Sequence, residues 1–328
     1  MIGFDIGGTK CSVSIGVERN GQLEILCKQV IPTDRTVSPL VMVDRMCVLA
    51  ENMSGQLQQT GKENAENIWD AIGISCGGPL DSKRGVILSP PNLPGWDEVP
   101  IVVYLQQKYH TKVSLQNDAN ACAVAEWRYG AGKSCRNMIF LTFGTGMGAG
   151  LILDGKLYAG TNDMAGEIGH VRMAAAGPIG YGKAGSFEGF CSGSGIAAMG
   201  KEAAKKALSE GHTVSYCNSV EELPQITAKK IAECAFAGAE DAKAIYRYCG
   251  EKLGAGLAIL VDVLNPEKIV IGSIFERCEA LLREPMEQKL KEECISYAGQ
   301  VCQVVPAALT ENIGDYAALS VAAMGRNQ

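Results

Sequence analysis

The sequence predicts an α/β fold with mixed sheets, organised as two related halves. Apolar runs of strand length alternate with helix-like segments along the 328 residues. Each half opens with two apolar runs that are joined by a glycine-rich turn, and such a short connection forces an antiparallel pair. The length also fits about two domains. We therefore expect each half to carry a mixed sheet flanked by helices.

The first half begins with a strand over residues 1–4, a turn with the sequence Asp5-Ile6-Gly7-Gly8-Thr9-Lys10, and a strand over 11–16. The turn has no room for a helical crossover, so these two strands predict a hairpin. The further elements expected here are a strand over 23–31, a helix over 38–60, a strand over 71–75, a rigid loop over 92–96 and a helix over 99–108.

The second half repeats this plan about 135 residues later. Residues 138–143 form an apolar run, the turn from Gly144 to Gly150 is rich in glycine, and residues 151–153 are apolar again. The repeat is weak by identity but clear by pattern. The elements expected afterwards are helices over 196–210, 227–237 and 241–264, a strand over 268–271, a helix over 274–293, a strand over 301–306 and a helix over 315–325.

Asn117 and Asp118 stand between an apolar run (113–115) and a helix-like segment (121–129). Asparagine is a favoured N-cap residue, which places Asp118 in the first turn of that helix. The positive end of the helix dipole is expected to keep its carboxylate ionised. A charged carboxylate at this junction is a candidate for accepting a proton from a hydroxyl. The alternative is that Asp118 only supports the helix cap.

Composition excludes several classes of protein. The net charge is −6 and no basic cluster exceeds two adjacent residues, so neither nucleic acid nor an anionic membrane is expected as a partner. The first residues show no basic and apolar region and no run approaches 18 apolar residues, so neither a signal peptide nor a membrane span is expected. The thirteen cysteines are scattered, which predicts reduced thiols in a cytoplasmic protein. Only three histidines occur, so a multi-histidine metal site is not expected.

The two glycine turns predict phosphate binding. Glycines let backbone N–H groups approach an anion closely, and hydroxyl or ammonium groups add donors. Asp5 is suited to hold Mg²⁺ through water. The candidate residues are Asp5, Gly7, Gly8, Thr9 and Lys10 in the first turn, and Gly144, Thr145 and Gly146 in the second. Neither turn fits a Walker A or a Rossmann pattern, and for either turn alone a purely structural hairpin is the alternative.

A second set of polar residues fits a polyol. Carboxylates and amides bind sugar hydroxyls in pairs, and the candidates are Asn92, Asn117, Asp118, Glu167, His170 and Glu188. Structural roles remain the alternative for His170 and Glu188. Gly254 and Gly256 lie within a long helix, and Gly272-Ser273 follows a strand. These glycines indicate either close helix packing or room for a nucleotide base.

Six motifs, taken together and in order, resemble those of the ROK family, which contains bacterial sugar kinases and sugar-responsive repressors. They are Asp5-Ile6-Gly7-Gly8-Thr9-Lys10, Gly77-Gly78-Pro79-Leu80-Asp81, Asn92-Leu93-Pro94-Gly95-Trp96, Asn117-Asp118-Ala119-Asn120, Gly144-Thr145-Gly146-Met147-Gly148 and Gly166-Glu167-Ile168-Gly169-His170. The resemblance implies an actin/hexokinase-like two-lobe fold with ATP and sugar in the cleft, and a C-terminal helix packed on the N-terminal lobe. It places the smaller lobe at 1–115 plus 311–328 and the larger at 116–310, and implies a homodimer.

The resemblance also implies roles for the candidates. Asp118 resembles the catalytic base. The sugar contacts would be Gly78, Asn92, Asn117, Asp118, Glu167, His170 and Glu188. The two glycine turns would hold the phosphates of ATP with Mg²⁺ at Asp5, while Gly254, Gly272 and Ser273 would lie near the adenosine.

One departure from the family is visible after His170. Many members carry a cysteine cluster there that binds zinc, but no cysteine occurs here before Cys191, so no zinc site is expected. A helix-turn-helix domain before Asp5 is not expected either.

The sequence thus predicts an ATP-dependent kinase that phosphorylates a hexose or an N-acylhexosamine at a primary hydroxyl. The alternatives are a non-catalytic sugar-binding regulator and a kinase of the same fold that acts on an acid or another polyol.

Overall fold

The computed structural model describes residues 1–59 and 65–326. By their contacts these residues form two compact units, and each unit is discontinuous in sequence. Unit 1 comprises Met1–Arg136, Gly150–Ala165 and Ala308–Gln328, and unit 2 comprises Asn137–Ala149 and Gly166–Ala307. The predicted lobe boundaries near residues 115 and 310 do not coincide with the bounds of these units. Those boundaries therefore stay a prediction.

Unit 1 is built on a five-stranded sheet with the order β3-β2-β1-β4-β7. Its strands are β1 (Ile2–Ile6), β2 (Lys10–Arg19), β3 (Gln22–Pro32), β4 (Ala71–Cys76) and β7 (Lys112–Asn117). β1 and β2 pair antiparallel, which confirms the first hairpin, and β1, β4 and β7 run parallel. The sheet is therefore mixed, as the short first turn requires.

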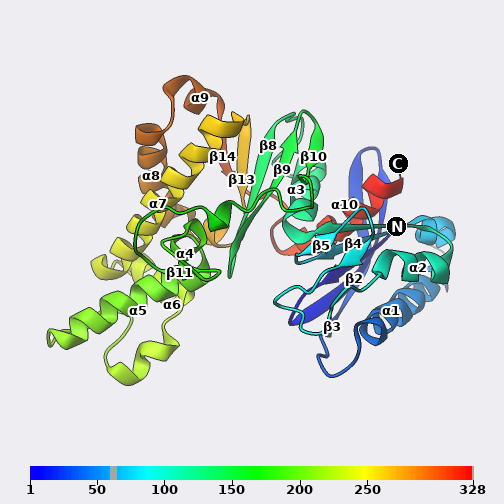
Figure 1. Cartoon of the computed structure of the whole chain (residues 1–328), viewed down its shortest axis with the longest axis horizontal. Coiled ribbons are helices and arrows are strands. Elements are labelled where there is room, and N and C mark those ends of the chain that lie inside the picture. Colours follow the sequence, from blue (N-terminus) through cyan, green and yellow to red (C-terminus); the bar gives the residue numbers. More distant parts are fainter. Residues whose placement is uncertain (60–64, 327–328) are drawn as a thin grey trace. The chain divides into compact units, whose positions relative to one another are not determined.

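Helices cover both faces of this sheet (Figure 1). Ile2, Phe4 and Ile6 point to the face where α1 (Pro39–Gln59) and α2 (Ile101–Tyr109) complete the core. The predicted end of the first helix at Thr60 lies outside the described residues. The other short segments of unit 1 are η1 (Ala65–Asp70), β5 (Leu80–Asp81), β6 (Val86–Ile87), α3 (Asp118–Tyr129), β10 (Lys156–Tyr158) and η4 (Thr310–Asn312).

The C-terminal helix α10 (Ile313–Arg326) packs on the opposite face, against β1, β4 and β7. Small residues make this close approach possible. A Cβ at Gly3 would lie 2.9 Å from Ala318 Cβ, and one at Gly73 would collide with the backbone of Ala318. The expectation that the C-terminal helix returns to the N-terminal sheet is confirmed.

The second sheet has the order β10-β9-β8-β13-β14. It contains β8 (Met138–Phe143), β9 (Met147–Leu153), β13 (Lys268–Ile271) and β14 (Gln303–Pro306), and β9 runs on from unit 2 into unit 1. β13 is parallel to both β8 and β14. In both sheets the first strand of the half is central, the second and third strands lie on one side and the two later strands on the other. This shared order confirms the internal repeat.

Helices make up most of the rest of unit 2. They are η2 (Ile168–His170), α4 (Phe187–Phe190), α5 (Gly193–Ser209), η3 (Val220–Gln225), α6 (Ala228–Phe236), α7 (Glu240–Leu264), α8 (Ile274–Glu293) and α9 (Ser296–Val301), with a small hairpin of β11 (Ile179–Gly180) and β12 (Lys183–Ala184). The strand expected over 301–306 begins at Gln303, because Val301 still belongs to α9.

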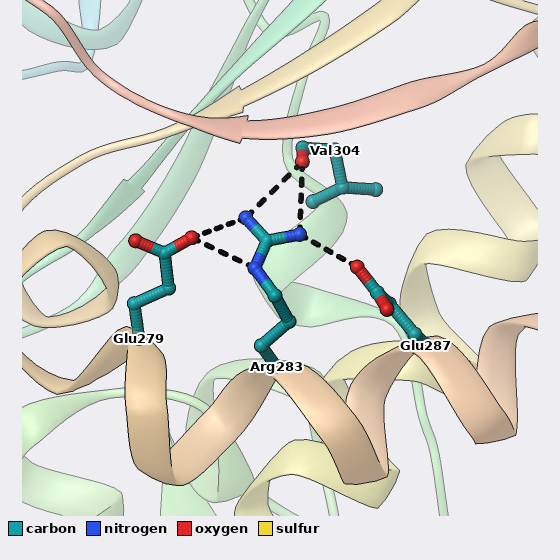
Figure 2. A network of polar contacts seen from close by, with 4 residues as sticks. All are labelled: Glu279, Arg283, Glu287 and Val304. Carbon is teal, nitrogen blue, oxygen red and sulfur yellow. Dashed lines mark hydrogen bonds and ion pairs between the residues drawn. The ribbon is translucent and has the colours of Figure 1, made fainter.

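Arg283 connects α8 to β14, the edge strand of the second five-stranded sheet (Figure 2). Its guanidinium donates to Glu279 at 2.7 Å, to Glu287 at 2.6 Å and to the backbone carbonyl of Val304 in β14 at 3.4 Å. Glu279, Arg283 and Glu287 are spaced four residues apart, so all three lie on one face of α8. In the part of the chain that the structure describes, no helix is long and apolar enough to span a membrane.

Candidate active site

In unit 1 three predicted motifs follow strands that end in line. Ile6 of β1 lies beside Cys76 of β4, and Cys76 lies beside Asn117 of β7. Because the carboxyl ends of parallel strands meet at one edge of a sheet, the segments that follow them are neighbours. The sheet register therefore brings together the first glycine turn, the Gly77-Gly78 turn and Asp118.

The first glycine turn is held by its carbonyl groups. The Gly7 N–H donates to the Lys10 carbonyl at 3.2 Å, and the Gly7 carbonyl accepts the Thr33 hydroxyl at 2.6 Å. The Gly8 carbonyl accepts two bonds from Arg35, at 2.7 and 3.2 Å. Among residues 1–59 and 65–326, no acceptor pairs with the N–H groups of Gly8 or Thr9. These two donors are available to an anion.

Asn92 and Asn117 lie against the same turns. A Cβ at Gly8 would lie 2.9 Å from Asn92 Cβ, and one at Gly77 would lie 3.3 Å from the Asn92 side-chain amide. A Cβ at Gly78 would lie 3.2 Å from the Asn117 amide. The glycines leave room for both amides to reach this edge of the sheet. Three of the predicted sugar contacts, Gly78, Asn92 and Asn117, are thus brought together.

Asn117 caps α3 as the sequence predicts. Its side-chain oxygen accepts the N–H groups of Ala119 and Asn120 at 3.0 and 3.4 Å. Asp118 is the first residue of the helix, and its Oδ1 accepts the Ala119 N–H at 2.8 Å. That contact fixes the carboxylate and leaves Oδ2 to face a ligand.

The expected direction of the pKa shift of Asp118 needs correction. The carboxyl group is open to solvent, yet protein surrounds it closely enough that desolvation raises its pKa. Its hydrogen bond with Ala119 opposes this shift but does not cancel it. The helix dipole was expected to keep the acid ionised, which would lower the pKa. Desolvation outweighs the helix terminus here, and a carboxylate of raised pKa is the stronger base.

Asp5 lies in a field of negative charge. Desolvation is the largest cause that raises its pKa to about 6, followed by the charges of Asp118 and Asp315, while a hydrogen bond with Ser75 opposes them. Asp315 itself is buried and paired with Lys28 at 2.9 Å. A cation at Asp5 would relieve this repulsion. Mg²⁺ usually takes only one or two protein carboxylates and keeps several waters, so this donor set fits it.

The second glycine turn, in unit 2, has the same pattern. The Gly144 N–H donates to the Gly146 carbonyl at 3.1 Å, and the Gly144 and Thr145 carbonyls accept the Gly193 N–H and the Ser194 hydroxyl, both at 2.8 Å. Over the described ranges, the N–H groups of Thr145 and Gly146 have no acceptor. Each unit therefore presents one glycine turn with two unpaired donors at its tip.

Glu188 joins this turn from α4. Its Oε2 accepts the Met147 N–H at 3.0 Å, and a Cβ at Gly146 would lie 2.7 Å from the same oxygen. Ser186 caps the short helix by accepting the Gly189 N–H at 3.1 Å, which aims the Glu188 side chain. The predicted sugar contact thus lies directly against the predicted phosphate turn.

A cavity of about 640 Å³ opens beside the second turn within unit 2. Its walls come from that turn and from α5, α6, α7 and α8. The lining residues are Gly144, Thr145, Gly193, Ser194, Thr227, Ala228, Lys229, Ala232, Glu233, Phe236, Tyr246, Ser273, Ile274, Arg277 and Cys278. The lining combines backbone and hydroxyl donors at the turn with apolar side chains from the helices. Such a cavity suits a molecule with an anionic end and a flat apolar end.

Ser273 belongs to this cavity, whereas Gly254 does not line it. Ser273 has a positive φ of 64° and its N–H donates to Glu276 at 2.7 Å, which starts α8 with a capping box. A Cβ at Gly254 would collide with the Met286 carbonyl and lie 2.9 Å from Leu290 N on α8. Close helix packing therefore accounts for Gly254. Gly272 precedes Ser273 and does not line the cavity either.

Glu167 and His170 are exposed at η2. The loop that follows is held by its own backbone. The Met173 and Ala174 N–H groups donate to the Gly185 carbonyl at 2.8 and 3.1 Å, and Lys183 donates to the His170 carbonyl at 2.7 Å. The Cys191 thiol donates to the Cys249 carbonyl in the core. The absence of zinc stays a prediction.

Several residues at these sites escaped prediction. In unit 1 they are Thr33, Arg35, Ser75 and Asp315, and in unit 2 they are Ser194 and the helix residues that line the cavity. Most act through a backbone carbonyl or through one face of a helix, and neither leaves a motif. The Pro32-Thr33-Asp34-Arg35 segment after a strand was the one available signal.

Comparison with known proteins adds independent information. The sequence profile of the ROK family matches residues 1–324. A glucokinase of Halalkalibacterium halodurans is 31% identical over 291 residues, which cover 88% of this chain and 84% of the relative. A xylose repressor of Caldicellulosiruptor bescii is 32% identical over 203 residues, covering 62% of this chain and 49% of the repressor.

Among solved structures, a ROK family glucokinase from Streptomyces griseus in complex with glucose and AMPPNP superposes with a TM-score of 0.74. It is 28% identical, and the match covers 100% of this chain and 99% of that one. The structural similarity therefore extends along the whole chain.

Proposed function

The chain belongs to the ROK family, and we propose that it is an ATP-dependent sugar kinase that phosphorylates a hexose or an N-acylhexosamine at its primary hydroxyl. The observation that carries this proposal is the pair of glycine turns, one in each unit, each with two unpaired N–H groups. Unpaired N–H groups at a glycine turn are the usual donors to the phosphate oxygens of a nucleotide, and each unit offers one such turn. The glucokinase relatives support the choice of reaction.

Asp118 is the proposed general base. Its Oδ1 is held by the Ala119 N–H, so Oδ2 would accept the proton of the sugar hydroxyl. The hydroxyl oxygen forms a bond to the γ-phosphorus while the bond from that phosphorus to the bridging oxygen of ADP breaks. Phosphoryl transfer depends mainly on positioning and on charge stabilisation, so one aligned base and fixed donors are sufficient machinery.

The nucleotide is proposed to occupy the cavity of unit 2. Its volume of about 640 Å³ lies within the usual range for cofactor sites. The base and ribose would contact apolar residues such as Phe236, Tyr246 and Ile274, while the phosphates would meet the Gly144–Gly146 turn. A Cβ at Gly144 would lie 3.6 Å from the Ser273 hydroxyl, so Ser273 lies next to the glycine turn. It would contact the nucleotide between the phosphates and the base.

Mg²⁺ is proposed to bind near Asp5, which would hold it through water. When bound, the ion neutralises charge on the phosphates. The protein's own part is to keep the Asp5 carboxyl beside Asp118 and Asp315, where a cation is favoured.

The sugar is proposed to contact Gly78, Asn92, Asn117, Glu167, His170 and Glu188. The side chains of this set offer carboxylate, amide and imidazole groups, which pair with adjacent hydroxyls. We also propose a cytoplasmic location, which suits thirteen cysteines that are all free thiols, and a homodimer as in the family.

The test is an assay of ADP release with purified protein, ATP and Mg²⁺ against glucose, mannose, N-acetylmannosamine, N-acetylglucosamine, allose and fructose. We expect sugar-dependent ADP with at least one of them. The repressor relative motivates the alternative, a sugar-binding regulator. A regulator would be stabilised against heat by a sugar and would release no ADP, and that result would contradict the proposed kinase.

A further inference from the structure

Arg35 lies at the first glycine turn and has no assigned role. It follows β3 and is exposed, yet both Nε and Nη2 donate to one atom, the Gly8 carbonyl oxygen, at 3.2 and 2.7 Å. An exposed arginine normally keeps its guanidinium in water or pairs with a carboxylate. Two hydrogen bonds to a single carbonyl fix that peptide unit in one orientation.

The nearest carboxylate in sequence is already occupied. Asp34 accepts the Thr36 N–H at 2.9 Å and its hydroxyl at 2.6 Å, and its other oxygen pairs with Arg45 at 2.8 Å. Over residues 1–59 and 65–326, Arg35 forms no ion pair. Asp34 is therefore already paired, and Arg35 is left to the glycine turn.

Because of the geometry of the peptide bond, the contact between Arg35 and the Gly8 carbonyl also sets the direction of the following N–H group. In a trans peptide the C=O and the following N–H point in opposite directions. Thr33 holds the Gly7 carbonyl at 2.6 Å, so the Gly8 N–H points away from Thr33. Arg35 holds the Gly8 carbonyl, so the Thr9 N–H points away from Arg35. These are the two unpaired donors of the turn.

A glycine turn needs such restraint because its peptide units rotate easily. Glycine populates positive and negative φ about equally, so an unheld peptide between Gly8 and Thr9 can flip and turn its carbonyl toward an anion. We propose that Arg35 is a positioning residue for phosphate binding, which acts by holding the Gly8 carbonyl and so aiming the Thr9 N–H at a phosphate oxygen of ATP. This inference rests on the proposed kinase function.

Three variants test it. Arg35→Met keeps the length and removes every donor, and Arg35→Lys keeps one donor able to reach the Gly8 carbonyl. Arg45→Met is the matched control, since it removes a neighbouring surface cation that contacts Asp34 and not the turn. Binding of MgAMPPNP and of adenosine is measured by calorimetry, the KM values for ATP and sugar by steady-state kinetics, and folding by thermal denaturation.

For Arg35→Met we expect MgAMPPNP binding at least tenfold weaker, the size of one lost hydrogen bond to a charged group, with adenosine binding within twofold of wild type. KM for ATP should rise while KM for sugar stays within twofold. The Kd of Arg35→Lys for MgAMPPNP should stay within about threefold of wild type. The Kd of Arg45→Met should stay within twofold of wild type.

The inference is overturned if Arg35→Met binds MgAMPPNP within twofold of wild type, if it loses adenosine affinity equally, or if Arg45→Met shows the same loss. The binding arm needs no turnover, so it separates this inference from the proposed reaction. A wild-type protein that binds MgAMPPNP but releases no ADP with any sugar contradicts the kinase and still tests Arg35. A wild-type protein that does not bind MgAMPPNP contradicts both.

Discussion

The Glu188 carboxylate accepts a hydrogen bond from the Met147 backbone N–H at 3.0 Å, and this bond joins α4 to the second glycine turn. Glu188 is also a proposed sugar contact. One side chain is therefore shared between the part of unit 2 that would meet the sugar and the part that would meet phosphate. Changes at Glu188 should affect both ligands.

Replacing Glu188 separates its two roles. Glu188→Ala removes the acceptor for the Met147 N–H, so the turn loses one of its anchors and KM for ATP should rise about tenfold or more. Glu188→Gln keeps an oxygen that can accept this bond, so its KM for ATP should stay within about threefold. Steady-state kinetics with varied ATP checks this. An unchanged KM for ATP in Glu188→Ala would show that the turn does not depend on Glu188.

Asp118→Asn should abolish phosphorylation and leave the fold intact. The amide preserves the size of the side chain and can still accept the Ala119 N–H, but it cannot take up a proton. Loss of a general base typically lowers kcat by 10²–10⁴-fold. Thermal denaturation and AMPPNP binding serve as controls for folding. A variant that retains more than about a tenth of wild-type kcat would contradict the role.

Asp5 should make stability fall with rising pH in the absence of Mg²⁺. Its pKa is raised from 3.8 to about 6, so the folded state favours the protonated acid. That advantage is full below about pH 4 and is lost as the pH rises through 6. Asp5→Asn has no carboxyl group to ionise, so it avoids the cost of burying a charged Asp5. It should be more stable than wild type at pH 7–8 by up to about 3 kcal/mol, and this difference should vanish near pH 4.

Thermal denaturation of both proteins at each pH checks the Asp5 prediction. Asp34→Asn is a control of opposite sign. Hydrogen bonds from Thr36 and Arg45 lower the pKa of Asp34 to about 2. Asp34→Asn should therefore destabilise the folded protein at neutral pH, and this effect should shrink as the pH falls toward 2. Equal pH profiles for wild type and Asp5→Asn would contradict the electrostatic reading of Asp5.

Gly254→Ala distinguishes packing from nucleotide binding. The added methyl group would collide with the Met286 carbonyl on α8, and such overpacking costs about 1–3 kcal/mol. KM for ATP should remain within twofold, because Gly254 does not line the cavity. Gly55→Ala in α1 is the matched control. Nothing lies within 4 Å of its Cβ position, so it should stabilise the protein by about 0.5–1 kcal/mol. A tenfold rise in KM for ATP in Gly254→Ala, without loss of stability, would favour the nucleotide role.

The strands and the two hairpins were predictable because period and turn chemistry act over a few residues. The same local rules placed Asn117 at the start of α3 and Asp118 in its first turn. They failed for the pKa of Asp118, because desolvation depends on how many atoms of distant segments surround a group. A helix terminus can be read from sequence, but its surroundings cannot.

The cavity of unit 2 shows the other limit. Tyr246 lies on α7 and Cys278 on α8, and the two side chains meet only because these helices pack closely. Spacing along the chain does not say which faces of separate helices converge. The same holds for Arg35, whose partner is the carbonyl of a glycine and therefore leaves no side-chain pattern. The close contact of Gly254 with α8 could not be predicted from sequence for the same reason.

The position of α10 has a consequence for synthesis of the chain. The ribosome completes β1, β4 and β7 early, but α10, which packs on their second face, is made only after all of unit 2. During that time the sheet residues Gly3 and Gly73 lack the contacts that they make with Ala318 of α10. Unit 1 therefore finishes folding only after α10 has been made. A stop codon before Ile313 would remove few residues and yet leave the first sheet unfinished, which favours aggregation.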